Sequence, residues 1–178
     1  GHNIAVGGTS GKTTVTAMLG YILDRLGQKP CMIDGGLLLN YADREGIPNI
    51  IYNEGDITYQ NSNLKADYMQ INMDNKMVYA YGKPDSLEGK PIVTKPEFSE
   101  GDASYTMDTI TYNLTSKKAK IKGVATQQGD GWLVGGSVKK MPDNTINIEN
   151  GKYTTCDETD HPHFYLAMTK ATVLSLIH

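Results

Sequence analysis

The first residues that could do chemistry form the glycine-rich run GGTSGKTT near the N-terminus. Such a run can direct backbone N–H groups and a helix N-terminus at one anion. Lys12 would add positive charge at the outer phosphates, and the Thr13 hydroxyl could bind Mg²⁺. Gly8 and Gly11 would let the backbone approach the phosphates closely. The strict phosphate-loop pattern is not met, because Val6 occupies the position of its first glycine. We predict phosphate-loop geometry, for which ATP and Mg²⁺ are the ligands to consider, although neither is required.

A second group of reactive side chains surrounds the C-terminal cysteine, and comprises Cys156, Asp157, Glu158, Asp160, His161 and His163. In an extended strand, His161 and His163 would point to the same side, a spacing compatible with zinc. Acidic residues are also common in exposed turns, and we predict no metal site here. We predict no catalytic residues either, because nothing in the sequence fixes a nucleophile and a base in space.

The residues around the glycine-rich run predict a strand, a turn, a helix and a second strand over residues 3–36. Residues 4–6 form a short apolar run, and residues 31–33 form the next one. Between them, apolar side chains at helical spacing predict one core-facing helix face, made of Val15, Met18, Leu19, Ile22, Leu23 and Leu26. Gly27 would end this helix. A β-α-β start of this kind needs further strands to be stable.

From about residue 50 onward the apolar period changes from helical to alternating. Met69, Ile71 and Met73 alternate with polar residues, a turn follows at residues 74–76, and a second run leads to Gly82. Residues 108–123 repeat residues 67–82 without a gap, and a looser third copy runs over residues 138–151. Repeated hairpins predict stacked antiparallel strands, as in a β-jellyroll or roll. The predicted fold is therefore mainly β, with a small N-terminal β-α-β phosphate-loop fragment.

Three segments follow from this change of pattern: a phosphate-loop fragment over residues 1–40, a junction over 41–51 and a β-rich domain over 52–178. The formal net charge of −3, from 17 basic and 20 acidic residues, argues against a nucleic-acid partner. No run approaches the roughly 20 consecutive apolar residues that span a bilayer. The chain as given also shows no signal-peptide pattern, so we expect no export signal in it.

The string IAVGGTSGKTTVTAMLGYIL resembles the start of the central domain of Mur ligases, the ATP-dependent amino-acid ligases of peptidoglycan synthesis. The nucleotide loop of that family, GTxGKTT, is matched by Gly8, Thr9, Ser10, Gly11, Lys12, Thr13 and Thr14. Nothing later in the chain supplies the family's magnesium ligands, its carbamylated lysine or its other domains. Ligase activity is therefore not expected. The alternative reading of this fragment is a β-α-β remnant that packs a helix on a sheet without binding ATP.

A longer resemblance, over about residues 52–171, is to the N-terminal periplasmic region of OstA-like lipopolysaccharide-assembly proteins. It is carried by YNEGDITYQNSNLKADYMQINMDNKMVYAYGKPDS, PEFSEGDASYTMDTITYNLTSKKAKIKGVATQQGDGWLVG and NGKYTTCDETDHPHFYLAMTKA. The resemblance implies a non-catalytic β-jellyroll whose interior holds acyl chains of lipopolysaccharide or lipid A. It also implies edge-to-edge pairing with other lipopolysaccharide-transport β-sheet proteins. The location it implies is the periplasm or the periplasmic face of the outer membrane, whereas the missing export signal would leave the chain in the cytoplasm.

Alternation places a set of apolar side chains on one face of the predicted hairpins, where they could line a groove for acyl chains: Met69, Ile71, Met73, Ile110, Tyr112 and Leu114. Methionine suits such a lining, because its side chain is unbranched and adaptable. The same residues could equally form the sealed core of a β-sandwich. Three functions stay open: a lipopolysaccharide-transport module, an ATP-binding fragment of a Mur-type ligase, and a fused chain with no evolved activity.

Overall fold

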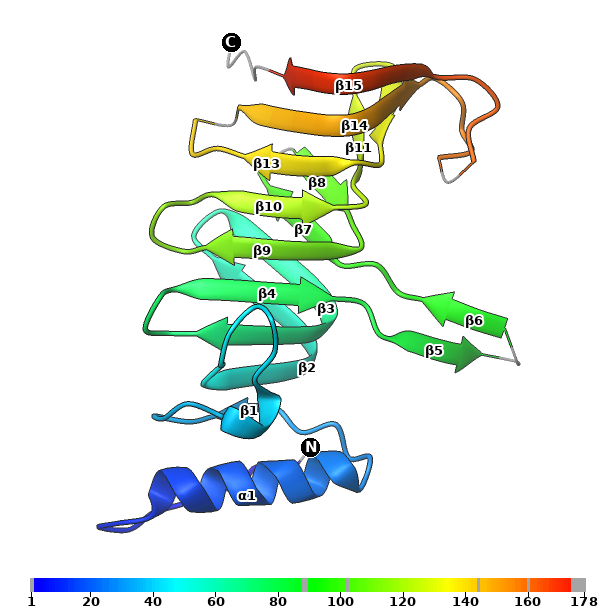
Figure 1. The fold of residues 1–178 in the computed structure, drawn as a ribbon. Helices are drawn as coiled ribbons and strands as arrows, with labels where there is room; N and C mark the ends of the chain where they lie inside the picture. Colours follow the sequence, from blue (N-terminus) through cyan, green and yellow to red (C-terminus); the bar gives the residue numbers. More distant parts are fainter. Residues whose placement is uncertain (1, 88–89, 102, 144, 160, 174–178) are drawn as a thin grey trace.

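The computed structural model describes residues 2–87, 90–101, 103–143, 145–159 and 161–173. Within them the chain is mainly β, as the alternating pattern predicted, and the strands are stacked along one direction with the helix at one end (Figure 1). Three elements form the N-terminal part: helix α1 (Lys12–Arg25), strand β1 (Met32–Ile33) and the 3₁₀ helix η1 (Leu39–Tyr41). Strand β15 lies at the opposite end of the stack.

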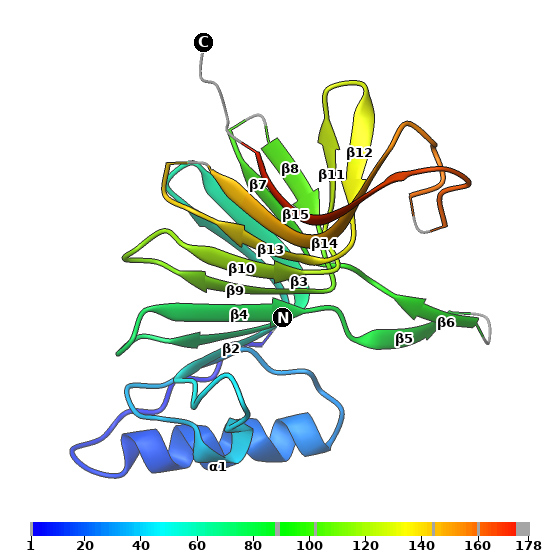
Figure 2. The ribbon, with the colours of Figure 1, turned by 45° about the horizontal axis from the view of Figure 1, so that its top comes forward.

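The β-rich part has two layers joined into one antiparallel sheet. The first layer contains, in spatial order, β2 (Ile50–Tyr59), β3 (Ser62–Asn72), β4 (Met77–Tyr81), β9 (Thr109–Asn113), β10 (Ala119–Lys122), β13 (Ser137–Lys140), β14 (Ile146–Thr154) and β15 (Leu166–Val173). The second layer contains β7 (Glu97–Glu100), β8 (Ala103–Thr106), β11 (Ala125–Gln128) and β12 (Gly131–Val134). A separate hairpin, β5 (Pro84–Leu87) and β6 (Lys90–Val93), projects to one side (Figure 2).

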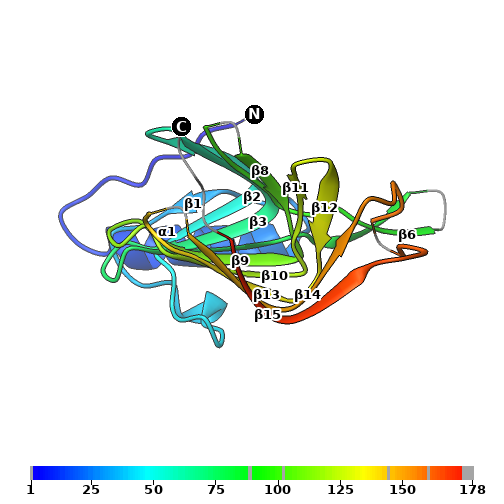
Figure 3. The ribbon, with the colours of Figure 1, turned by 90° about the horizontal axis from the view of Figure 1, so that it is seen from above.

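The long strands β3 and β14 join the two layers. The second half of β3 pairs with β4 in the first layer, whereas its first half pairs with β7 in the second. In the same way, β14 pairs with β13 through one half and with β12 through the other. The path of paired strands that leaves β3 through β4 therefore returns to it through β7, and the two layers face each other in the view along the stack (Figure 3).

The three predicted sequence repeats are consecutive hairpins of the first layer. They correspond to the hairpins β3–β4, β9–β10 and β13–β14. Strand β4 pairs with β9, and β10 pairs with β13, so each hairpin adds its backbone hydrogen bonds to the next one. This confirms the prediction of stacked antiparallel hairpins. It also explains the repeat, because each unit must place the same alternation of apolar side chains on the inner side of the stack.

Two short glycine corners carry the chain between the layers, one after β10 and one after β12. Gly123 separates β10 from β11, and Gly135 and Gly136 separate β12 from β13; all three have positive φ angles. Backbone hydrogen bonds continue across these corners, from the Gly123 N–H to the Gly136 carbonyl (3.2 Å) and from the Gly135 N–H to the Val124 carbonyl (2.7 Å). The corners thus bend the strands without leaving these backbone groups unpaired.

The main hydrophobic core lies between the two layers. It is formed by buried side chains from both of them: Leu64, Met69, Ile71, Val78, Ala80, Phe98, Tyr105, Met107, Ile110, Tyr112, Ala119, Ile121, Val124, Leu133, Val138, Ile146 and Ile148. A smaller cluster joins the N-terminal part to the outer side of β2 and β3, and contains Met32, Leu38, Ile51 and Tyr68. In the paired segment of β2 and β3 next to the N-terminal part, neighbouring residues alternate between the clusters: Ile51 and Tyr68 belong to the small one, and Tyr52 and Met69 contact or belong to the main one.

The N-terminal part differs from the β-α-β arrangement that the sequence predicted. Residues 4–6, predicted as a strand, form none, and β1 pairs antiparallel with β2 through Met32 and Ile33. The prediction that one helix face is core-facing is also wrong in part. Leu19 and Leu23 are half-buried, but the rest of the predicted face is exposed: Val15, Met18, Ile22 and Leu26. The reason is that among the described residues only a thin layer around Met32 covers one side of α1.

Candidate functional site

The predicted phosphate-loop residues lie together in an exposed turn that leads into α1. Residues 7–14 are all exposed, and helix α1 begins at Lys12. Gly8 and Gly11 have positive φ angles of 149° and 76°, which favour glycine. The Lys12 ammonium donates a hydrogen bond to the Gly8 carbonyl at 2.6 Å, so the lysine side chain folds back over the loop. An anion at the helix N-terminus would meet both this ammonium and the unpaired amides of the first helical turn.

One buried carboxylate close to this loop has an unused oxygen. Asp34 Oδ1 accepts a hydrogen bond from the Gly36 N–H at 3.2 Å, but Oδ2 is buried and has no hydrogen-bond partner among the described residues. Gly36 lies against the Thr13 side chain, so the loop and the carboxylate belong to one neighbourhood. A carboxylate and a hydroxyl are oxygen ligands of the kind that Mg²⁺ prefers. Thr13 and Asp34 would therefore be the residues to hold a magnesium ion that accompanies a nucleotide.

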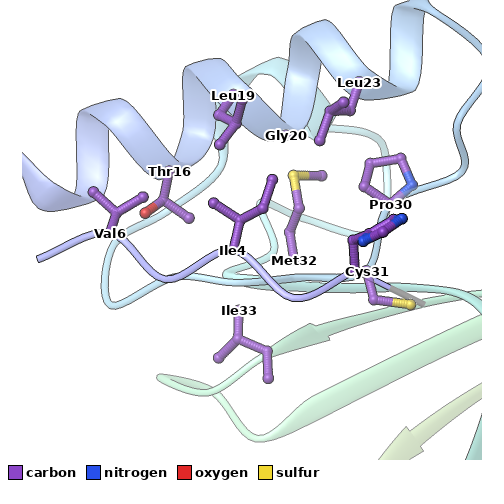
Figure 4. Close-up of a pocket in the computed structure, with 11 residues that line it drawn as sticks. Ile4, Val6, Thr16, Leu19, Gly20, Leu23, Pro30, Cys31, Met32 and Ile33 are labelled. Atoms are coloured by element: carbon purple, nitrogen blue, oxygen red, sulfur yellow. The ribbon is translucent and has the colours of Figure 1, made fainter.

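A cavity of about 290 Å³ lies between α1 and the extended N-terminal segment (Figure 4). Its walls include Ile4 and Val6 on one side, Leu19 and Leu23 of the helix on another, and Met32 below. The Met32 side chain reaches the position that a Cβ on Gly20 would occupy, so glycine at this position permits the close approach of helix and strand. The cavity indicates incomplete packing of the helix on the residues beneath it.

A second, smaller opening leads into the core between the two layers. This cleft of about 30 Å³ is lined mainly by apolar side chains: Ile57, Tyr59, Ser62, Asn63, Leu64, Val78, Phe98, Tyr112 and Leu114. Phe98 comes from the second layer and Tyr112 from the first, and their ring centroids are 5.8 Å apart. Burial first, and the Glu100 carboxylate second, raise the pKa of Tyr112. The cleft is about wide enough for one water molecule in its present form.

The six residues predicted to face lipid occupy three different environments. Met69, Ile71 and Ile110 are buried in the core, the first and the last of them completely. Tyr112 and Leu114 line the apolar cleft, Tyr112 as a buried residue and Leu114 as a partly buried one. Met73 follows the end of β3 and is 40% exposed. The structure therefore brings two of the six to the opening of the interior.

An ion pair lies inside the stack beside this cleft. Lys140 of β13, whose side chain is only 4% exposed, places its ammonium 2.5 Å from Glu100 Oε2 of β7. The pair connects one layer to the other. The Glu100 carboxylate also acts on two core tyrosines. Burial raises the pKa of Tyr105 and of Tyr112, and the negative charge of Glu100 raises both further. Lys140 and Val138 are the two buried residues of β13. The alternating pattern predicted apolar side chains at such inward positions, so the buried lysine was not predicted.

Most of the cleft residues were not singled out from the sequence. Ile57 and Phe98 lie on β2 and β7, which the repeat pattern does not include, and Leu64 lies in the first half of β3, before the repeat begins at residue 67. Phe98 belongs to β7, whose four residues are too few to show a clear alternation. The available signal was composition, since Phe98 is one of two phenylalanines in the chain.

The cluster around Cys156 lies in the loop between β14 and β15, and Asp160 falls outside the described residues. Cys156 Sγ lies 3.4 Å from His163 Nδ1, a contact that the sequence did not predict. No group of three or more His, Cys, Asp or Glu side chains in the described ranges is arranged to hold a metal ion. Within those ranges, no helix has the length and apolar character needed to cross a membrane.

No family model matches the chain. The chain is similar over short stretches to proteins named UDP-N-acetylmuramate--L-alanine ligase. The ligase of Jannaschia sp. (strain CCS1) is 54% identical over 40 residues, which are 22% of this chain and 8% of that protein. The ligase of Bartonella bacilliformis is 33% identical over 90 residues, 47% of this chain and 18% of that protein. The ligase of Parvibaculum lavamentivorans is 47% identical over 39 residues, 22% of this chain and 8% of that protein. The chain thus matches less than a fifth of the length of each relative, which is consistent with a Mur ligase fragment.

Proposed function

We propose that the β-rich part is a non-catalytic lipopolysaccharide-assembly module that binds acyl chains between its two layers, in the periplasm. The observation that carries this proposal is the mainly apolar cleft between Phe98 of the second layer and Tyr112 of the first. The cleft is continuous with the core, because both rings and Leu64 also belong to the core cluster. An acyl chain that enters there would exchange water for apolar surface at about 25 cal/mol per Å².

The present width of the cleft requires that side chains move before a chain can enter. Tyr59 and Leu114 stand at the rim and are incompletely buried, so they could turn outward at small cost in contacts. In the core cluster that the cleft opens into, Met69 and Met107 are completely buried. Their flexible side chains could repack around an irregular ligand. Binding would thus widen a closed interior by moving the rim outward and repacking the methionines of the core.

Edge-to-edge pairing with another lipopolysaccharide-transport β-sheet protein forms the second half of the proposal. Strand β15 pairs with β14 along one edge, and its other edge has no partner strand in the described part of the chain. An unpaired edge presents backbone N–H and C=O groups to which a strand of another protein can bind. Because β15 is at the end of the stack, a partner sheet would extend both layers and continue the apolar interior.

The lipid-binding proposal can be tested by photocrosslinking with lipid A in detergent. A photoreactive phenylalanine analogue would replace Tyr59 or Leu114 at the cleft rim, with exposed Lys120 on β10 as the matched control. We expect lipid A to crosslink at the two rim positions and not at position 120. Equal crosslinking at all three positions, or none at the rim, would contradict the proposal. Rim positions serve better than Ile71 or Ile110, which are buried in the core.

A second candidate is nucleotide binding by the N-terminal loop, as in a fragment of a Mur-type ligase. It is favoured by the short ligase matches and by the exposed loop at the start of α1, with Lys12 beside Gly8. The loop residues would cradle the phosphates, and Thr13 with Asp34 would hold Mg²⁺. The described chain has only one short strand beside α1, so catalysis of ligation is not part of this candidate.

Isothermal titration calorimetry with MgATP tests this second candidate. Lys12→Ala is compared with Arg25→Ala, which removes a cation from the opposite end of the same helix. We expect at least a tenfold loss of affinity for Lys12→Ala, because a charge-assisted bond contributes about 1.5–3 kcal/mol. Equal affinities would exclude the loop as the site. If neither ATP nor lipid A binds, the chain is better described as a fusion without evolved activity.

A further inference from the structure

The loop between β14 and β15 is closed at its neck by one buried hydroxyl. Thr154, which is 1% exposed, donates a hydrogen bond from Oγ1 to the Phe164 carbonyl at 2.6 Å. The same oxygen accepts a hydrogen bond from the Cys156 N–H at 3.0 Å. Thr154 therefore ties the start of the loop to its end. As a result, Cys156 and His163 lie next to each other although they are seven positions apart in the sequence.

The thiol and the imidazole meet at the base of this loop, within reach of solvent. Cys156 Sγ and His163 Nδ1 are 3.4 Å apart, and His163 is exposed. The backbone N–H of His163 lowers the pKa of Cys156 most, followed by its imidazole and by the backbone N–H of Glu158. In return, the hydrogen bond and the charge of Cys156 raise the pKa of His163. The surroundings of Cys156, with the His163 imidazole at its sulfur, thus favour the thiolate form.

The other cysteine of the chain provides an internal comparison. The Cys31 thiol is exposed but donates its proton to the Asn53 carbonyl, with Sγ 3.5 Å from that oxygen. An imidazolium donor stabilises a thiolate, and the sulfur of Cys156 faces an imidazole whereas that of Cys31 faces a carbonyl oxygen. The two cysteines therefore differ in the partner of the sulfur atom and not in access to solvent alone.

We infer that Cys156 and His163 form a nucleophilic thiolate–imidazolium pair, and that Cys156 is a site of reversible modification by small aliphatic disulfides such as oxidised glutathione. In this step the Cys156 thiolate attacks one sulfur of the disulfide, a new S–S bond forms, and the old one breaks. The electron pair of the broken bond leaves on the released thiolate, which takes up a proton from solvent. The co-reactant is the disulfide itself, and a second thiol reverses the step.

His163 acts in this scheme as a positioning residue, since it holds the sulfur in its thiolate form and does not contact the incoming disulfide. Other titratable side chains on the same loop include Asp157, Glu158 and His161. The pair does not depend on lipid or nucleotide binding, so its test is independent of those proposals.

The experiment measures the rate at which each cysteine forms a mixed disulfide with oxidised glutathione, followed by intact-protein mass spectrometry at pH 7. Cys31→Ser leaves Cys156 as the sole cysteine, and Cys156→Ser leaves Cys31. We expect Cys156 to react about tenfold faster than Cys31, as thiolate stabilisation of this kind allows. In the Cys31→Ser background, His163→Ala should remove most of this advantage. His161→Ala, in the same loop, should change the rate by less than about twofold.

A pH profile of alkylation by iodoacetamide distinguishes positioning by His163 from a mere change in loop exposure. The midpoint for Cys156 should lie below that for Cys31 and should move up in His163→Ala. Thr154→Val keeps the side-chain volume but removes the hydroxyl that ties the loop ends together. Its Cys156 midpoint should lie between that of the wild type and that of His163→Ala. Equal rates for the two cysteines, or equal effects of His163→Ala and His161→Ala, would overturn the inference. An exposure change alone would alter the rates and leave the midpoint of Cys156 in place.

Discussion

At the scale of single residues, Phe98 connects the interior of the stack to its opening. Its ring lies 6.2 Å from the Tyr105 ring and 5.8 Å from the Tyr112 ring, measured between centroids, and its residue is 2% exposed. Phe98→Ala should lower the free energy of unfolding by about 3–5 kcal/mol, because it removes a buried ring and leaves a cavity. An apolar cavity of this kind stays dry and binds small apolar molecules.

Urea denaturation measures the loss of stability in Phe98→Ala. Titration with a fluorescent fatty acid measures whether this variant binds the fatty acid more tightly than the wild type, as the added cavity predicts. Phe164→Ala is the matched control, since Phe164 is 59% exposed and its loss should change stability by less than about 0.5 kcal/mol. If Phe98→Ala and Phe164→Ala behaved alike, the packing assigned to Phe98 would be incorrect.

The buried ion pair between Lys140 and Glu100 gives a second prediction at this scale. Glu100→Gln leaves the Lys140 ammonium buried without its counter-charge, and should lower stability by about 3–5 kcal/mol. Adding Lys140→Met to this variant removes the unpaired charge and should restore most of that stability. The comparison requires denaturation of wild type, both single variants and the double variant. Additive losses in the double variant would indicate that the two side chains do not interact.

At the scale of elements, glycine is needed for two reasons at a corner between the layers but for one reason in a surface turn. The corner requires both a positive φ and space for a close backbone approach, whereas the turn requires only the positive φ. Gly136 has φ of 74°, and a Cβ there would meet the carbonyl oxygens of Glu149 and Asn150. Gly129 has a similar φ of 60° in an exposed turn, and a Cβ there would meet nothing. Gly136→Ala should therefore cost about 3 kcal/mol or more, whereas Gly129→Ala should cost about 1–2 kcal/mol, the strain of a left-handed alanine alone.

Thermal or urea unfolding of the two glycine variants measures this difference directly. Both substitutions change the unfolded chain in the same way, so the excess cost at Gly136 reports the clash with β14 in the folded state. Equal costs would mean that the corner can shift by a few tenths of an ångström to accept a side chain.

The first layer of the stack was predictable from the sequence, but the second layer was not. The hairpins over residues 67–82 and 108–123 show clear alternation around a polar turn, and both form as predicted. The strands of the second layer have four residues each and belong to no repeated hairpin, so neither their length nor a repeat reveals them. Their pairing with β3 and β14 also joins residues far apart in the chain, which local patterns do not encode.

The candidate sites were predictable to a similar degree. The glycine-rich loop was identified because its signal is local, although the sequence does not reveal that Lys12 bonds to Gly8. Alternation identified Tyr112 and Leu114, but could not distinguish a residue at an opening from one sealed in the core, such as Ile110. The contact between Cys156 and His163 depends on the Thr154 hydroxyl, and therefore on the folded loop.

At the scale of the whole molecule, the two textures of the sequence correspond to two kinds of packing. The β-rich part encloses a core with side chains from both layers, whereas α1 contributes only Gly20 as a buried residue. Helical periodicity reports that Val15, Met18, Ile22 and Leu26 share a face, but not whether anything covers it. In the described residues nothing covers these four side chains, which is the physical reason why the core prediction for α1 failed at them and not at Leu19 and Leu23.

This difference in packing predicts that the helix opens more readily than the stack. Amides in β9 are hydrogen-bonded between β4 and β10 and lie over the core, so their exchange should require nearly global unfolding. Amides in α1 are protected by helix hydrogen bonds and by a small cluster around Met32 and Leu38. We expect their opening free energy to be lower by about 2 kcal/mol or more, measured by native-state hydrogen exchange. Equal protection of α1 and β9 would show that the small cluster with Ile51 and Tyr68 couples the two parts into one cooperative unit.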